Sequence, residues 1–129
     1  HRIKNLQTGE LGGWLEKESN LSREGSCWVA DEAKVYGDAK VFGLHSLVCD
    51  CAEVYENAVI DGGRVSGHSK VYGHAIIGSD EWGPAEIKDF VKVFDYAVAA
   101  GNCSVSGHAK IFGHAKFWHC TIGDNVNKS

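Results

Sequence analysis

Ser66-Gly67-His68-Ser69-Lys70-Val71-Tyr72-Gly73-His74-Ala75 recurs as Ser106-Gly107-His108-Ala109-Lys110-Ile111-Phe112-Gly113-His114-Ala115. Both stretches follow a six-residue pattern of small, polar, aliphatic, aromatic, glycine and polar residues, which marks an internal repeat. The small and aliphatic residues are two positions apart, so in a β-strand their side chains point to the same side. The glycine and the polar residue turn the chain. The pattern therefore predicts a three-sided parallel β-coil, because an amphipathic helix needs a spacing near 3.6.

The repeat covers most of the chain. It divides into five sets of eighteen residues, with Glu81-Trp82-Gly83-Pro84 inserted after the third: Cys27–Leu44, His45–Gly62, Gly63–Asp80, Ala85–Asn102 and Cys103–Cys120. We expect an irregular N-terminal cap over residues 1–26, a β-helix over 27–122 with a loop at 81–84, and a C-terminal tail over 123–129. Trp14 and Leu15 are the expected plug over the first coil. The predicted fold is an all-β, single-stranded parallel β-helix of about five coils.

Stacking the sets predicts the interior side chains. One small slot is alanine in every set: Ala39, Ala58, Ala75, Ala97 and Ala115. The first aliphatic slot is expected to hold Val29, Leu47, Val65, Ile87 and Val105. The second holds Val35, Val54, Val71, Val93 and Ile111, and the third holds Val41, Ile60, Ile77, Ala99 and Phe117.

Length, charge and cysteine content exclude several classes of protein. A chain of 129 residues suffices for one domain, and a formal charge of −4 argues against general coating of nucleic acid or anionic membrane. No apolar run reaches a membrane span and no signal-peptide pattern appears, so we expect a cytoplasmic protein with no membrane partner. The five cysteines include no CxxC pair. Cys27 and Cys103 share an inward column about 19 Å apart, too far for a disulfide, so we expect reduced core cysteines.

Two outer faces of the predicted coil carry residues suited to binding a ligand or another protein chain. The second face carries an aromatic ladder beside a mostly basic column, which is suited to a nucleotide or a single-stranded nucleic acid, to simple stacking, or to a subunit contact: Tyr36, Tyr55, Tyr72, Phe94 and Phe112, with Lys34, Lys70, Lys92 and Lys110. The third face is apolar outside: Phe42, Val59, Ile76, Val98 and Trp118. Contiguous outward apolar residues are rarely exposed to solvent, so we expect the N-terminal segment or another subunit to cover them. We expect a homo-oligomer, either a trimer or a dimer.

Four histidines occupy two corner columns of the predicted coil. His68 and His108 share one column, and His74 and His114 share the next, each pair two coils apart. Two imidazoles about 9.6 Å apart cannot bind one zinc ion, because each zinc–nitrogen bond is only about 2.1 Å long. The ordinary interpretation of each is a polar turn residue, and the functional alternative is a general base.

The repeat resembles the hexapeptide repeat of left-handed parallel β-helix proteins, in which an aliphatic residue is followed four positions later by a small one. Val35 to Ala39 and Val71 to Ala75 show this spacing. Left-handed winding is implied by this resemblance. The segments at 9–16 and 20–22 resemble a bacterial and phage subgroup that carries an acyltransferase label. This chain departs from the family by placing aromatic residues directly after the aliphatic ones of the second face.

The resemblance implies two enzyme chemistries. Hexapeptide acyltransferases place a corner histidine as general base between subunits and use an acyl-coenzyme A, which makes His114, His74, His68 and His108 the candidates, His114 first. Residues 113–125 locally resemble gamma-class carbonic anhydrases, whose zinc is held by histidines of two subunits, which makes His114 and His119 the metal candidates. The stacked third ligand of that family is missing, because Gly101 and Ser79 precede His119 in its column.

The sequence favours a non-catalytic binding or scaffold protein that acts as a homo-oligomer, of a phage type that binds or sequesters a host component. An acyltransferase using acyl-coenzyme A is the alternative, and a zinc-dependent protein like gamma-class carbonic anhydrase comes after it. A protein or nucleotide partner is expected on the aromatic ladder. No cofactor is assigned outside the two enzyme readings.

Overall fold

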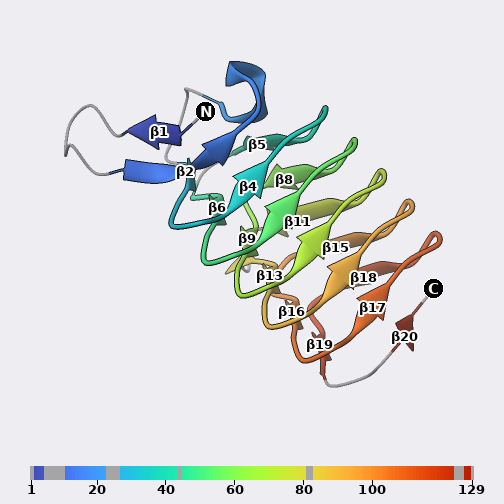
Figure 1. Cartoon of the computed structure of the whole chain (residues 1–129). Helices are drawn as coiled ribbons and strands as arrows, with labels where there is room; N and C mark the ends of the chain where they lie inside the picture. Colours follow the sequence, from blue (N-terminus) through green and yellow to red (C-terminus); the bar gives the residue numbers. More distant parts are fainter. Residues whose placement is uncertain are drawn as a thin grey trace.

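The computed structural model describes residues 2–4, 11–22, 27–43, 45–80, 83–123 and 127–128. The chain winds as an all-β, left-handed parallel solenoid of about six triangular coils, with the two termini towards opposite ends of the stack (Figure 1). Among the described residues the one helix is a short 3-10 turn, η1 (Glu18–Asn20), and no helix there has the length and apolar character needed to cross a membrane. The predicted fold class is confirmed.

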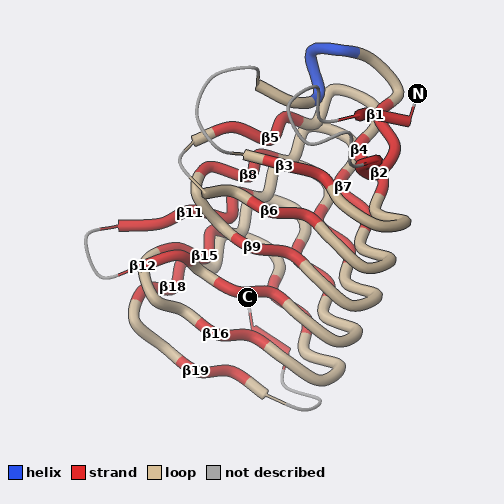
Figure 2. Tube along the Cα trace, turned by 90° about the vertical axis from the view of Figure 1, so that its left-hand side faces the viewer, coloured by secondary structure: helices blue, strands red, loops and turns tan. Residues whose placement is uncertain are grey.

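Each side of the triangle is a β-sheet. The first face holds β3 (Trp28–Val29), β6 (Leu47–Val48), β9 (Arg64–Val65), β13 (Glu86–Ile87), β16 (Ser104–Val105) and β19 (Thr121–Ile122). The second holds β1 (Arg2–Lys4), β2 (Leu11–Leu15), β4 (Lys34–Val35), β7 (Glu53–Val54), β10 (Lys70–Val71), β14 (Lys92–Val93), β17 (Lys110–Ile111) and β20 (Asn127–Lys128). The third holds β5 (Lys40–Phe42), β8 (Val59–Asp61), β11 (Ile76–Asp80), β15 (Val98–Ala100) and β18 (Lys116–Trp118). β11 extends beyond the third face and pairs antiparallel with β12 (Gly83–Pro84), so this hairpin projects from the coil (Figure 2).

The interior follows the predicted columns on two faces. The second-face and third-face aliphatic columns pair coil by coil in the expected register. The alanine column is buried throughout, with Ala39 at 0% and Ala115 at 7% exposure. Burying each valine or isoleucine side chain contributes about 1.5–3 kcal/mol, so the stack of aliphatic columns is the main source of stability.

The prediction for Leu47 is wrong. Val48 pairs with Val29 and Val65 and is fully buried, whereas Leu47 pairs with Trp28 and Arg64 and is half-buried. The step from Phe42 to Leu47 is five residues, against three from Asp61 to Arg64, so the corner between the third and first faces takes up two more residues in this coil than in the next. The set His45–Gly62 contains a seven-residue and a five-residue unit, and placing the additional residue of the first unit after Leu47 rather than before it moved the assignment by one position.

Residues 11–22 form a further coil in register with the others. β2 pairs in parallel with β4, which puts Leu15 in the Val35 column at 6% exposure, and Leu21 bridges to Val41. Leu15 therefore covers the interior as expected. Trp14 instead stays outside at 38% exposure, and its indole N–H donates to the Glu32 carboxylate at 3.3 Å.

Carboxylates link the coils at the corners. At the first two corners of each coil the fifth residue of the six-residue unit has a positive φ, which glycine adopts without strain, as at Gly67 (φ +66°) and Gly73 (φ +66°). The neighbouring coil often carries an acid there, and its side chain accepts the glycine N–H: Gly67 donates to Asp50 at 2.9 Å and Gly73 to Glu56 at 2.8 Å. These bonds hold adjacent corners in register.

Candidate functional site

The aromatic residues of the second face stack as one continuous column. Ring centroids are 5.0 Å apart for Tyr36–Tyr55, 5.0 Å for Tyr55–Tyr72, 5.1 Å for Tyr72–Phe94 and 5.5 Å for Phe94–Phe112. The rings are parallel to within 10° and all are half-buried. We call this column the aromatic ladder. Each ring inside it lies against a ring on both sides, so ring edges rather than ring faces meet the solvent.

This stacking limits what the ladder can bind. Inserting a base between two rings needs a spacing of about 7 Å, twice the ~3.4 Å rise of stacked bases. The Tyr55–Tyr72 spacing is 5.0 Å, so no base fits between these two rings without separating the coils. A nucleotide or nucleic acid partner on this face, which stays a prediction, would therefore use the lysine column and the ring edges.

The lysine column lies beside the ladder and is interrupted once. Lys34, Glu53, Lys70, Lys92 and Lys110 pair in this order from β4 to β17. Lys70 lies 3.8 Å from the Glu53 carboxylate, and both side chains are partly exposed, so this ion pair contributes less than about 1 kcal/mol. The remaining cations form a positive line along the wall.

Burial and charge raise the pKa of the ladder phenols. Burial first, and then the negative charge of Glu53, raise the pKa of Tyr36 from its ordinary value of 10.0 to about 12. The Tyr36 hydroxyl also donates to Glu53 at 3.2 Å. Burial likewise raises the pKa of Tyr55 and Tyr72. The ladder is therefore uncharged at neutral pH.

We expect alkaline pH to destabilise the fold through Tyr36. Because its folded-state pKa lies above its unfolded value, its contribution is fully present below pH 10.0 and is lost as pH rises towards about 12. Thermal unfolding and phenolate absorbance should be followed over this window in wild type and Tyr36→Phe. The variant should lose less stability between these pH values, and identical pH dependence in both would contradict this role of Tyr36.

Each pair of corner histidines encloses an aromatic ring. At the first corner, Phe90 stacks 5.3 Å from His68 and 4.9 Å from His108. At the second corner, Tyr96 stacks 4.9 Å from His74, with the planes 2° apart, and 5.1 Å from His114. The repeat predicts the shared columns of histidines. The intervening rings were missed, although Phe90 and Tyr96 occupy the same slots in the fourth set.

All four imidazoles lie on the surface in fixed orientations. His68, His74, His108 and His114 are exposed, as are Phe90 (51%) and Tyr96 (54%). Each imidazole lies nearly parallel to the neighbouring Phe90 or Tyr96 ring, within 7°, and remains exposed to solvent. This orientation suits proton transfer to a ligand at the corner.

The two metal candidates are not on the same corner. His114 lies before β18 at the second corner, and His119 lies after β18, with its N–H donated to Gly101 at 2.8 Å. The chain therefore has to cross the third face between them. Zinc binding by His114 and His119 stays a prediction, and any shared ion would need ligands from another copy.

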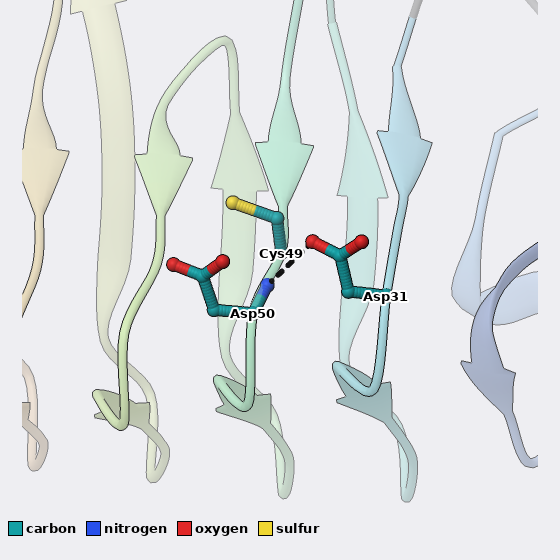
Figure 3. A group of neighbouring side chains, drawn as sticks. All are labelled: Asp31, Cys49 and Asp50. Atoms are coloured by element: carbon teal, nitrogen blue, oxygen red, sulfur yellow. Dashed lines mark hydrogen bonds between the residues drawn. The ribbon is translucent and has the colours of Figure 1, made fainter.

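Among the described residues, Asp31, Cys49 and Asp50 are the one group whose ligand atoms gather within metal-binding range, at 4.8 Å or less (Figure 3). Both carboxylates already serve the corner register: Asp31 accepts the Asp50 N–H at 3.2 Å and Asp50 accepts the Gly67 N–H. Burial, and then the charges of Asp50 and Asp31, raise the pKa of the Cys49 thiol to about 11. The proximity of these three side chains is therefore explained by the hydrogen bonds that align adjacent coils at this corner.

A shallow hollow of about 350 Å³ opens at the second corner, towards the N-terminal end of the stack. We call it the corner hollow, and it is lined by Lys17, Ser19, Asp38, Lys40, Asn57 and Val59. The Lys17 ammonium donates to Asp38 at 2.9 Å. This site was not predicted from the sequence, because residues 1–26 were expected to form an irregular cap and Lys17 and Ser19 were therefore assigned to no corner.

The third face carries its apolar residues in two neighbouring columns. Val59, Ile76 and Val98 are consecutive in one column, and we call them the third-face strip. Lys40 and Lys116 continue this column at either end. Phe42 (38% exposed) and Trp118 (52% exposed) end the adjacent column, with Asp61, Gly78 and Ala100 between them.

Comparison with known proteins adds one relative. No protein-family model and no solved structure matches the chain. The chain is similar to YdcK, an uncharacterised acetyltransferase of Escherichia coli (strain K12), with 33% identity over 67 residues that cover 45% of this chain and 20% of that protein. The chain thus spans about a fifth of the length of this relative. The similarity fits a hexapeptide-repeat β-helix, whereas the phage subgroup and the carbonic anhydrase resemblance stay predictions.

Proposed function

We propose that this β-helix is an acyltransferase that takes its acyl group from a coenzyme A thioester. The observation that carries the proposal is the pair of second-corner imidazoles, His74 and His114, which are exposed and held in one orientation by Tyr96. The similarity to a protein named as an acetyltransferase supports the same chemistry. It supports this alternative better than the non-catalytic scaffold that the sequence favoured.

In the proposed reaction a second-corner imidazole acts as general base. It removes the proton from an acceptor hydroxyl or amine, and the freed electron pair attacks the thioester carbonyl carbon. The tetrahedral intermediate collapses with cleavage of the carbon–sulfur bond, and the proton passes from the imidazolium to the departing coenzyme A thiolate. The products are the acylated acceptor and free coenzyme A.

The lysine column offers a place for the donor. Coenzyme A carries several phosphate groups, and Lys34, Lys92 and Lys110 present ammonium groups along the exposed second face. Because the second corner joins this face to the third, a donor lying along the lysines would bring its thioester towards the corner imidazoles. The edges of the aromatic ladder would contact its adenine and pantetheine parts.

Native mass spectrometry of the chain with acetyl-coenzyme A tests donor binding. We expect a retained mass of one coenzyme per copy, and competition by free coenzyme A. Lys92→Glu should weaken retention, because it reverses one charge in the middle of the lysine column. If the chain binds no acetyl-coenzyme A at concentrations that saturate ordinary acyltransferases, the proposal is contradicted. The non-catalytic scaffold would then be the better interpretation.

The same spectra test self-association through the third-face strip, which we propose as the contact between copies. The double replacement Ile76→Glu and Val98→Glu should reduce the mass to that of one chain, because two carboxylates would be buried without partners. Lys88→Glu, on an exposed side chain of the first corner, is the matched control and should leave the assembly unchanged. An unaltered subunit count in the double variant would exclude this face.

A further inference from the structure

We propose that the corner hollow binds the acyl acceptor, that this acceptor is a small anion carrying a hydroxyl or amine, and that His74 is the base that serves it. The inference rests on the proposed acyl transfer and specifies its acceptor site. Three features of the structure carry it: how the hollow is formed, which charges line it, and which imidazole is nearest to it.

The hollow exists because Asn20 turns inward. By count from Leu15, Asn20 corresponds to Lys40 of the next coil, whose side chain points outward. The 3-10 turn η1 reverses this orientation: Asn20 is fully buried, and its amide donates to the Gly37 carbonyl at 3.2 Å and to the Ala39 carbonyl at 2.8 Å. The outward column that ends in Lys40 therefore has no member above it. The hollow lies at this end of the column and extends past Lys40 to Asn57 and Val59 of the following coil.

The charges around the hollow favour an anion. Among the residues that line the hollow, Lys17 and Lys40 supply two ammonium groups and Asp38 one carboxylate, so the lining itself carries a net charge of +1. The hydrogen bond from Lys17 lowers the pKa of Asp38 below its ordinary value, and the charges of Lys17 and then Lys40 lower it further. Asp38 therefore stays ionised and holds Lys17, while Lys40 remains at the rim.

The polar groups of the hollow suit an acceptor with further functional groups. The Ser19 hydroxyl and the Asn57 amide are exposed there and offer both donors and acceptors. Val59 supplies an apolar wall. A small phosphate or carboxylate that also carries a hydroxyl or amine would satisfy the ammonium groups with its anionic end and present its nucleophile along the corner.

The column at the corner selects His74 over His114. Asp38, Asn57 and His74 follow one another in adjacent coils, because the Asp38 N–H donates to Glu56 and the Asn57 N–H donates to Gly73. His74 is thus one coil, about 5 Å, from the Asn57 wall of the hollow. Tyr96 covers the far side of His74 at 4.9 Å, and His114 lies on the other side of Tyr96, 5.1 Å from that ring, so it is two coils further from the hollow.

Inorganic phosphate is the probe for the anion site. Amide resonances of the full chain should be followed by NMR as phosphate is added at constant ionic strength, in wild type, Lys40→Gln and Lys116→Gln. Lys116 is the matched control because it is an exposed lysine at the other end of the same outward column. We expect shifts at residues 17–20, 38–40 and 57, and a Kd about fivefold weaker in Lys40→Gln alone.

The outcomes separate this inference from the proposed function. Equal weakening in both variants, or shifts spread over all lysine columns, would mean that phosphate meets only general surface charge and would overturn the hollow as a site. If phosphate binds the hollow but acetyl-coenzyme A is never consumed, the anion site stands and acyl transfer fails. If acetyl transfer proceeds unchanged in Lys40→Gln with an anionic acceptor, acyl transfer stands and the acceptor hollow fails.

Discussion

Replacing His74 with alanine should lower kcat/KM for acetyl transfer by at least about 100-fold, the smallest usual contribution of a general base. The loss should fall on kcat, because the imidazole acts on the reacting proton rather than on the anionic end of the acceptor. His74 is exposed and its partner is a surface ring, Tyr96 at 4.9 Å, so the variant should keep its fold. Thiol release from acetyl-coenzyme A measures the rate.

Two matched variants show whether the effect belongs to this position. His68→Ala removes an equally exposed imidazole that stacks on Phe90 at 5.3 Å at the first corner, and it should change the rate less than about threefold. His114→Ala removes the imidazole on the other side of Tyr96, and should also have a small effect. A large loss in His114→Ala with little in His74→Ala would move the base to His114 and contradict the acceptor hollow.

Replacing Asn20 with alanine should lower the free energy of unfolding by about 2–3 kcal/mol. The change removes both donors to the Gly37 and Ala39 carbonyls, and it removes the oxygen that accepts the Lys17 N–H at 2.8 Å. Leaving such buried groups unpaired costs about 1–3 kcal/mol each, partly relieved where water can enter at the end of the stack. The thermal midpoint should fall by roughly 6–12 °C.

Hydrogen exchange locates the damage. The Trp14 N–H donates to Ala33 at 2.8 Å and the Ser22 N–H donates to Val41 at 2.9 Å, so both should exchange faster when the first coil opens. Ser19→Ala, at the exposed neighbour of Asn20, is the control and should change stability by less than about 0.5 kcal/mol. Unchanged protection of these two amides in Asn20→Ala would show that Asn20 does not hold the first coil.

The fold was readable because its repeat fixes both the period and the inward face. The positions that Val71 and Ala75 occupy hold an aliphatic residue and an alanine in every set. The 40-residue offset between the two signature stretches, four more than two sets of eighteen, indicated one insertion. Leu47 was misplaced because the corner before it, not the strand, is longer than the corresponding corner of the next coil. Such a shift leaves the period of the following sets intact, so a pattern of small and aliphatic residues does not locate it.

The candidate site was only partly readable. The corner columns of His74 and His114 follow from the repeat, whereas their separation by Tyr96 needs the fourth set to be aligned slot by slot. The corner hollow had no sequence signal, because it depends on the inward turn of Asn20 against the residue count. A polar residue at an outward slot gives no sign in the sequence that a 3-10 turn has buried it.

Consumption of acetyl-coenzyme A by the full chain tests the central claim most directly. Free thiol should be followed with a set of small phosphates and carboxylates that carry a hydroxyl or amine, against the same mixtures with His74→Ala. We predict acceptor-dependent thiol release in wild type that falls to near background in the variant. Thiol release that no acceptor raises above the rate of buffer alone would contradict acyl transfer at the second corner.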